Sequence, residues 1–411
     1  MNLRSGLGKW NAIIGSFAAW MLAACGFWVL VFTMHGIKVT WGLSETQTGA
    51  LISVTLASRF VGAVVSGAVA EAYGKKSPLL CSIGLCGVFG FLGSVAPTYK
   101  FLLLSRALFG VGLGGIWVAG MALALEPLRG PERGIASGLL QGGWNWGYVL
   151  AAVADSAIQL TFGSGSAEWH FMLGLGALPL LVIPWILTFV HGSPVNRSAD
   201  LNESGTSAAA KLPLLQILSP GLITTTIHTS LIMAALMSVY YSLTAYYPKF
   251  LATAGLRPLW FVLALNVGGI MGELIVGKLS STRLGRRYTV AIAAIVSIMA
   301  IPFYLHTNML LTRMLGAFFM GASGLGMWGV VPRFLADRFP SNLRAMGPGV
   351  AYHAGALIAS PAPVSIGWML DRGIGVASAM SVAIVVTCIS VILIILSGPE
   401  SWNVRSRSAA A

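Results

Sequence analysis

Charged residues are scarce in this chain. Only 9% of its 411 residues are Asp, Glu, Lys or Arg, whereas 56% are hydrophobic and the mean hydropathy is +0.81. Because so few polar side chains cannot cover a soluble domain of this size, a soluble globular protein is excluded. Acidic residues are the rarer kind, and 12 of them against 25 Lys and Arg give a net charge of +13. No basic run alternates with aromatic residues on a polar surface, so this charge does not indicate a nucleic-acid partner.

The chain also lacks the motifs of nucleotide-dependent and metal-dependent proteins. It contains no GxxxxGK[ST], no HExxH and no CxxC, and its four cysteines lie in apolar runs without metal-ligand spacing. ATP-driven transport and membrane-bound catalysis therefore have no support, and we expect no enzyme activity, no cofactor and no metal. The cysteines are expected to pack in the interior rather than to form disulfides. The first apolar stretch is too long for a signal-peptide core, so we expect it to be retained.

Long apolar runs are what the sequence does contain. Each run of about 20 residues can cross a hydrocarbon core of roughly 30 Å, and near-continuous hydrophobicity favours helices over barrel strands. We therefore predict an all-α membrane protein with twelve transmembrane helices. The predicted spans are 12–34, 46–71, 77–96, 100–123, 134–160, 169–191, 218–248, 258–280, 287–305, 308–332, 345–370 and 375–397.

Basic residues are distributed unevenly between the two ends of these spans. An even number of spans places both termini on one face, and 17 Lys and Arg lie on that face against 5 on the other. Since cytoplasmic loops carry the excess of Lys and Arg, both termini are predicted to be cytoplasmic. The protein is expected to be a multi-pass protein of the inner or plasma membrane.

The two halves of the sequence place glycine and arginine in similar positions. Such a repeat predicts two pseudo-symmetric six-helix bundles with a central site between them. We predict an N-terminal bundle over 1–191, a linker rich in Ser, Ala and Asn over 192–217, and a C-terminal bundle over 218–411. Three matching pairs lie 207 to 211 positions apart: Gly67 and Gly277, Arg106 and Arg313, and Arg133 and Arg344.

Three arginines lie inside the predicted spans, namely Arg59, Arg106 and Arg313. Only two acidic residues, Asp155 and Glu273, lie as deep, so a cavity between the spans is expected to carry excess positive charge. A guanidinium group can bind a carboxylate through two parallel hydrogen bonds, which favours an organic anion as the substrate. The structural alternative is that each arginine pairs with an acidic residue or with backbone carbonyls, and that Glu273 pairs with an arginine.

Other polar residues in the spans are candidates for the rest of the site. Asp155 and Glu273 are the candidates for carrying a proton, because acidic residues inside membranes often do so. His228 has a structural alternative, since a lone His in an apolar helix is often a hydrogen-bonded packing residue. Tyr246 and Tyr247 are expected at the membrane interface. Orienting hydrogen bonds to the substrate are expected from Asn145, His228, Tyr241, Asn266 and His353.

The turn after the second span has a distinctive pattern. It reads Gly67-x3-Glu71-x2-Gly74-Lys75-Lys76 and resembles the signature loop of the major facilitator superfamily. The resemblance implies that fold and a gating role for these residues together with Arg133. Family members usually have Asp where this chain has Glu71 and Arg where it has Ala72, so weaker gating ion pairs are expected.

The fourth and fifth spans contain a second pattern, made of Arg106, the glycines at 110, 112, 114 and 115, Glu126, Pro127, Arg133, Gly138 and Asn145. This pattern is similar to that of the branch that holds bacterial sialic-acid permeases and yeast-type lactate permeases. The branch implies monocarboxylate:proton symport. Its members tend to have acidic residues where this chain has Ala23, Gly26 and Ile116, so proton coupling does not carry over directly.

Together these features predict a secondary active transporter of a small organic anion, specifically a monocarboxylate, that works by alternating access. If transport is proton-coupled, Glu273, Asp155 or His228 must carry the proton. One alternative is a uniporter or an anion exchanger of the same fold. Another is a transporter-like sensor or scaffold without coupled transport. The expected partners are the organic anion, protons and the lipid bilayer, and the expected state is a monomer.

Overall fold

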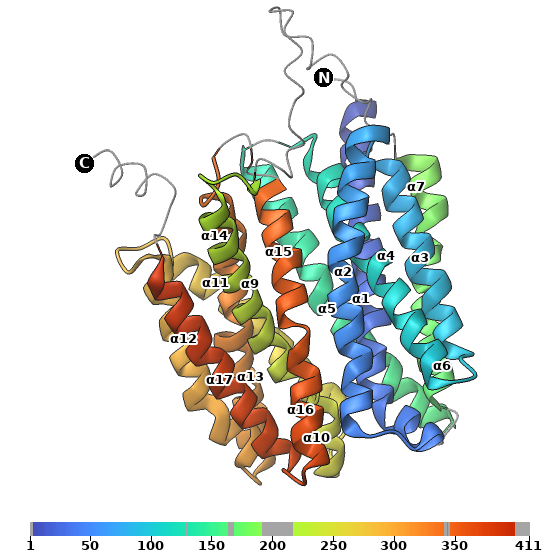
Figure 1. The fold of residues 1–411 in the computed structure, drawn as a ribbon, viewed down its shortest axis with the longest axis vertical. Coiled ribbons are helices and arrows are strands. Elements are labelled where there is room, and N and C mark those ends of the chain that lie inside the picture. The colour runs from blue at the N-terminus through green and yellow to red at the C-terminus, as the bar shows by residue number, and fades with distance from the viewer. Residues whose placement is uncertain are drawn as a thin grey trace, which may run out of the picture.

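The computed structural model describes residues 3–128, 130–162, 168–190, 217–340, 343 and 346–398, which form helices joined by short turns, with no β-strand among them (Figure 1). The first half contains α1 (Leu3–Trp41), α2 (Glu45–Tyr73), α3 (Lys76–Ser94), α4 (Tyr99–Leu125), α5 (Gly130–Phe162), α6 (Glu168–Gly174), η1 (Leu175–Val182) and α7 (Ile183–Phe189). The second half contains α9 (Ile223–Thr244), α10 (Tyr247–Thr253), α11 (Pro258–Leu279), α12 (Gly285–Ile301), η3 (Pro302–His306), α13 (Leu310–Met320), η4 (Gly321–Leu325), η5 (Gly326–Val330), α14 (Val331–Ala336), α15 (Met346–Ala359), α16 (Pro361–Asp371) and α17 (Val376–Ser397).

Ten helical segments of the described chain are long and apolar enough to cross a membrane. The two other predicted spans correspond to α5 and to α15 followed by α16. Helix α5 has a polar face that includes Gln141, Asn145 and Asp155, and Pro361 separates α15 from α16 because proline cannot donate a backbone hydrogen bond. The predicted all-helical membrane fold is therefore confirmed.

The helices form two groups that lie side by side (Figure 1). Helices α1 to α7 make one group and α9 to α17 the other, and we call these groups the first and second halves. We call the end of the bundle where α1 begins and α17 ends the N-face; the turns at 73–76 and 279–285 lie there. The opposite face carries the turns at 41–45, 94–99 and 371–376. The predicted domain boundaries stay a prediction, because 191–216 lies outside the described residues.

Matching glycines pack the helices of each half together. In the first half, a Cβ at Gly62 would clash with the backbone of Val111, so α2 and α4 touch through their backbones. In the second half, a Cβ at Gly268 would clash with the backbone of Phe318 in the same way. These partners lie 206 and 207 positions after the first pair, which extends the repeat seen in the sequence. Small residues at such crossings are typical of helix pairs in membranes.

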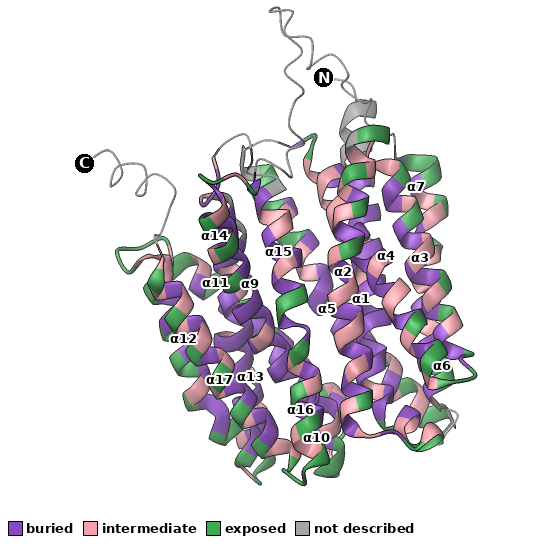
Figure 2. Cartoon of the chain, viewed as in Figure 1, coloured by how far each residue is buried: buried purple, intermediate pink, exposed green. Residues whose placement is uncertain are grey.

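The outer surface of the bundle is apolar. Figure 2 shows exposed residues along the outward sides of the helices. The exposed large hydrophobic residues include Leu274, Phe303 and Leu393. Such a surface fits the hydrocarbon region of a bilayer. Tyr246 and Tyr247, which we expected at the membrane interface, are instead fully buried, so that prediction is wrong.

Candidate functional site

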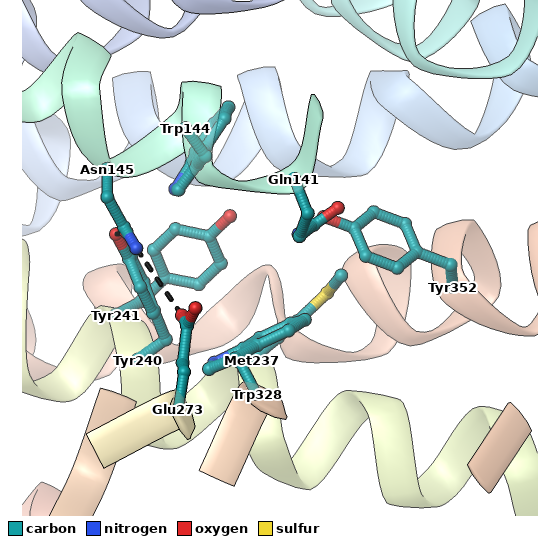
Figure 3. Close-up of a pocket in the computed structure, with 9 residues that line it drawn as sticks. All are labelled: Gln141, Trp144, Asn145, Met237, Tyr240, Tyr241, Glu273, Trp328 and Tyr352. Carbon is teal, nitrogen blue, oxygen red and sulfur yellow. Dashed lines mark hydrogen bonds between the residues drawn. The ribbon is translucent and has the colours of Figure 1, made fainter. Parts of the chain in front are cut away.

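A cavity lies between the two halves of the bundle. Its volume is about 20 Å³, which is enough for a water molecule but not for an organic substrate. Side chains from α5 of the first half and from α9, α11, η5 and α15 of the second half converge on it (Figure 3). A substrate can therefore enter only after parts of the two halves move. The lining residues are Gln141, Trp144, Asn145, Met237, Tyr240, Tyr241, Glu273, Trp328 and Tyr352.

A carboxyl group and an amide meet across the halves in this cavity. Asn145 Nδ2 on α5 donates to Glu273 Oε1 on α11 at 3.4 Å (Figure 3), and the hydroxyl of Tyr240 donates to Asn145 Oδ1 at 3.2 Å. No Lys or Arg of the described residues forms an ion pair with Glu273. The alternative in which Glu273 pairs with an arginine is therefore wrong for this structure.

Arg59 of α2 lies beside the cavity and is only 1% exposed. Its Nη1 donates to the hydroxyl of Tyr241 at 3.3 Å, and its Cζ lies 5.0 Å from the ring centre of Trp144 and 5.7 Å from that of Tyr352. Its Nε and Nη2 have no hydrogen-bond partner among the described residues. These two groups form one edge of the guanidinium, and two parallel N–H groups on such an edge can bind both oxygens of a carboxylate.

A pair of stacked rings joins the halves on the N-face side of Arg59. Trp117 of α4 and Tyr352 of α15 have ring centres 4.5 Å apart and planes 11° apart, and Trp117 Nε1 donates to Gln141 Oε1 at 3.3 Å. His353 is fully buried beside both rings, and neither of its ring nitrogens has a partner among the described residues. This aromatic contact must open if the cavity is to connect with the N-face.

The structure does not bring Arg106 and Arg313 to the cavity. Arg106 Nη1 donates to the carbonyl oxygen of Gly26 at 3.1 Å, within the first half. Arg313 Nη2 donates to the carbonyl oxygen of Thr307, within the second half. Both arginines therefore satisfy backbone carbonyls, which is the structural alternative stated above. The predicted group of three arginines is reduced to Arg59.

Three other candidates also lie away from the lining residues. Asn266 donates from Nδ2 to a carbonyl one turn back in its own helix at 2.8 Å. The Nε2 atom of His228 is 3.0 Å from the carbonyl oxygen of Ile394, so this ring interacts with the end of α17. Asp155 accepts hydrogen bonds from Gln159 Nε2 at 3.0 and 3.1 Å, near the opposite face of the first half. Only Asn145, Tyr241, Glu273, His353 and Arg59 of the predicted site lie in or beside the cavity.

The predicted gating residues lie on the N-face. Lys75 Nζ forms an ion pair with Glu126 Oε2 at 2.9 Å, and Lys76 Nζ donates to the carbonyl oxygen of Val190 at 2.7 Å. Gly74 has a φ of +84°, which explains why glycine ends α2. All of these contacts stay within the first half. Of the other predicted gating residues, Gly67 lies in α2 and Arg133 is exposed in α5. The side chain of Glu71 lies outside the described residues, and so does Arg344, the repeat partner of Arg133.

The opposite face is closed by charged contacts between the halves. Glu45 of α2 forms an ion pair with Lys38 of the first half at 2.5 Å and another with Lys249 of the second half. Asp371, at the end of α16, accepts hydrogen bonds from the backbone N–H groups of Glu45 at 2.7 Å and Thr46 at 2.9 Å. Asp371 therefore caps the first turn of α2 from the other half, where a negative charge also favours the helix dipole.

Asp371 is ionised in this position. Desolvation acts to raise its pKa, but the hydrogen bonds from the Thr46 hydroxyl and from the backbone amides of Thr46 and Glu45 outweigh this effect and lower the pKa of Asp371 to about 2.

Two glycines bring the backbones of α2 and α16 together near this cap. A Cβ at Gly49 would lie 2.8 Å from the carbonyl oxygen of Pro363, and a Cβ at Gly367 would clash with the backbone of Glu45.

Apart from Tyr241, the aromatic residues of the site were not predicted from the sequence, and neither were the contacts of the opposite face. The sequence did contain a signal for the aromatic residues, because α5 includes the stretch QGGWNWGY, which is too polar and aromatic for a helix that only faces lipid. It contained no signal for the contacts of the opposite face, because 326 positions separate Glu45 from Asp371. Pairing across such a distance depends on the fold.

Comparisons with known proteins agree with this fold. Residues 16–363 match the family model described as Major Facilitator Superfamily. The chain is 28% identical to the probable 4-methylmuconolactone transporter of Cupriavidus pinatubonensis over 94% of this chain and 90% of that protein. It is 23% identical to the sialic acid transporter NanX of Escherichia coli over 94% of this chain and 93% of that protein. A solved bacterial homologue of the human lysosomal transporter Spinster, inward-facing and occupied, aligns with a TM-score of 0.74 at 16% identity over 95% of this chain and 96% of that one. This chain therefore belongs to the Major Facilitator Superfamily and is a membrane transporter, not an enzyme.

Proposed function

We propose that this protein carries a small organic anion across the membrane, and that Arg59 binds the carboxylate of a monocarboxylate substrate. The observation that carries the proposal is the free edge of the Arg59 guanidinium, formed by Nε and Nη2, in a buried position between the halves. A buried cation without an acidic partner is costly, and a carboxylate that enters the site would remove this cost.

The names of the relatives support the same class of substrate. One relative is named for 4-methylmuconolactone and another for sialic acid. Both names describe small organic compounds rather than inorganic ions or peptides. The family match supports a carrier mechanism, in which the two halves alternately open the central site to each side.

The orientation in the membrane is also a proposal. The excess of Lys and Arg on the N-face supports a cytoplasmic location for that face and for both termini. In this orientation, the charged contacts of Glu45 and Asp371 close the outer side, and the Trp117–Tyr352 pair separates the site from the cytoplasm.

Arg59→Gln tests the proposal most directly. Purified protein in liposomes would be assayed for uptake of radiolabelled lactate, benzoate and N-acetylneuraminate. We expect Arg59→Gln to reduce uptake of the transported acid at least about thirtyfold, because loss of a buried charge partner costs about 2 kcal/mol or more. Arg372→Gln, on the opposite-face turn, is the matched control and should keep uptake. Both variants must elute as a single species in detergent.

Unchanged uptake by Arg59→Gln would remove Arg59 from the site. If the unaltered protein moves no carboxylate of the panel, the transport proposal fails and the sensor or scaffold alternative gains support.

We also propose Glu273 as the proton carrier if transport is coupled. It is the acidic residue that lines the cavity, and its contact with Asn145 links the halves, so a change in its protonation would act on that link. Glu273→Gln should make uptake independent of an imposed pH gradient, whereas Asp155→Asn should leave the dependence intact. If the unaltered protein shows no dependence on the gradient, the uniporter or exchanger alternative is favoured.

A further inference from the structure

The guanidinium of Arg59 is held at one corner. Its Nη1 donates to the hydroxyl of Tyr241 at 3.3 Å, whereas Nε and Nη2 have no hydrogen-bond partner among the described residues. The corner at Nη1 lies opposite the edge that Nε and Nη2 form. Because the group is planar and rigid, a contact that fixes this corner also sets the direction in which the opposite edge points.

Aromatic rings surround Arg59 as well, but they cannot replace this hydrogen bond. The ring centres of Trp144, Trp20 and Tyr352 lie 5.0, 5.6 and 5.7 Å from its Cζ. Such contacts attract the positive charge as a whole and confine the position of Cζ. They do not select which nitrogen points in which direction. The hydroxyl of Tyr241 can do so, because a hydrogen bond requires one N–H group to point at the oxygen.

Tyr241 reaches Arg59 from the other half of the bundle and is itself held in place. It lies on α9 and is only 3% exposed. Its ring centre lies 6.1 Å from that of Phe27 and 6.4 Å from that of Trp28, both on α1 of the first half. The hydroxyl therefore has a fixed position from which to hold Arg59.

An arginine whose edge is already aimed binds a carboxylate more tightly than one that turns freely. A long side chain without restraint loses rotamer freedom when it binds, and this loss weakens binding. We propose that Tyr241 is a positioning residue, which aims the Nε–Nη2 edge of Arg59 at the carboxylate and does not bind the substrate itself. This inference rests on the proposed function, because it takes Arg59 as the group that binds the carboxylate.

Tyr241→Phe tests the proposal, because it removes the hydroxyl and keeps the ring. Uptake into liposomes would be measured with whichever of lactate, benzoate and N-acetylneuraminate the unaltered protein takes up fastest. We expect the KM to rise about tenfold, the effect of losing a hydrogen bond to a charged group. The maximal rate should change less than about twofold, because the positioned arginine contributes to binding rather than to the movement of the halves.

Tyr247→Phe is the matched control. Tyr247 lies on α10 and is fully buried, and its hydroxyl has no hydrogen-bond partner among the described residues. The same chemical change at this position should therefore leave the KM unaltered. Both variants must elute as a single species in detergent.

A second measurement reads the position of Arg59 without any substrate. Magnetic resonance of protein that contains isotope-labelled arginine detects the Nε–H groups, and Arg59→Gln identifies the Arg59 signal by its loss. Tyr241→Phe should shift or broaden this signal, because the guanidinium becomes free to turn. Tyr247→Phe should leave the signal unchanged.

The outcomes separate this proposal from the proposed function. A raised KM with an unchanged Arg59 signal would show that Tyr241 binds the substrate directly, which would overturn the positioning role. An unchanged KM in Tyr241→Phe would overturn it too, while loss of uptake in Arg59→Gln would still support the proposed function. If the unaltered protein moves none of the three acids, or if Arg59→Gln keeps full uptake, the proposed function fails and the positioning role fails with it.

Discussion

The two ends of the central cavity are closed by different kinds of contact. On the opposite face, charges and helix caps cross between the halves, and the backbones of α2 and α16 touch at glycines. On the N-face side, the contacts between the described residues of the two halves include the stack of Trp117 and Tyr352 and, at the cavity, the hydrogen bonds of Asn145 with Glu273 and Tyr240. The ion pairs Lys75–Glu126 and Arg286–Asp337 each stay within one half. Among the described residues, charged contacts and a helix cap therefore cross the first closure, and aromatic and amide contacts cross the second.

This difference indicates which side opens more easily. Charge-assisted hydrogen bonds to a helix terminus each contribute about 1 kcal/mol and must break together if the opposite face is to separate. An aromatic pair contributes about 0.5–1.5 kcal/mol beyond the burial of its area. We therefore expect the closed structure to open toward the N-face more often than toward the opposite face. The following predictions test this expectation, beginning with the largest effect.

Gly49→Leu should abolish transport. The added side chain would meet the carbonyl oxygen of Pro363 and the hydroxyl of Tyr246, so the opposite face could not close. Uptake into liposomes would measure the effect. Gly84→Leu is the control, because a Cβ at this helical glycine meets nothing within 4 Å, and it should transport normally. Normal uptake by Gly49→Leu would mean that closure at α2 and α16 is not required.

Asp371→Asn should lower the equilibrium constant for closing the opposite face about fivefold. The amide lacks the negative charge that caps α2, at a cost of about 1 kcal/mol. Hydrogen–deuterium exchange of the Glu45 and Thr46 amides should be faster by that factor in the variant. Amides in the first turn of α4, which Thr98 caps, provide an internal reference that should not change. Equal exchange in the two proteins would show that Asp371 does not protect these amides.

Trp117→Leu should lower the equilibrium constant for closing the N-face by a smaller factor, about threefold, because one aromatic pair is lost while Leu keeps part of the apolar burial. Labelling of a cysteine introduced by Met237→Cys, with a reagent added at the N-face, should be faster by that factor. Trp260→Leu is the control, since Trp260 is 64% exposed on the outer surface. If labelling were instead faster with the reagent added at the opposite face, the opposite face would be the one that opens more easily.

The contribution of Asp371 should be insensitive to pH over most of the accessible range. Because its pKa is lowered to about 2 from an ordinary value near 3.9, the stabilisation is fully present above about pH 4 and is lost as the pH falls toward 2. The difference in melting temperature between the unaltered protein and Asp371→Asn should be constant from pH 7 to pH 5 and should shrink below pH 4. A difference that already disappears near pH 6 would contradict this assignment.

The fold could be predicted from the sequence largely because its signals are local. Apolar runs of membrane length, glycines at helix crossings and the uneven basic loops each follow from neighbouring residues. The repeat also includes contacts that were not predicted, such as Gly268 against Phe318, which repeats Gly62 against Val111. α5 was predicted as a span although its polar face keeps it out of the ten clearly apolar segments.

The site could be predicted only in part, because residue type does not fix the direction of a side chain. Arg59 and Arg106 look equivalent in sequence, yet one faces the other half and the other bonds to a carbonyl of its own half. His228 and His353 are both predicted to bind the substrate, but the ring of His228 in α9 contacts the end of α17 instead. Asp371 was not considered, because its partners come from a helix more than 300 positions away.

The tenth span departs from its counterpart in the repeat. Where α4 is one continuous helix, the second half has α13, a π-helical turn, a 3-10 turn and α14 in succession. Such irregular turns often mark places where a helix bends. Trp328 lies in the 3-10 turn, and a Cβ at the adjacent Gly329 would clash with the backbone of Glu273. Flexing at this joint would move Trp328, and Glu273 packed against it, relative to Arg59 on α2, so one wall of the cavity would shift while the other stays in place.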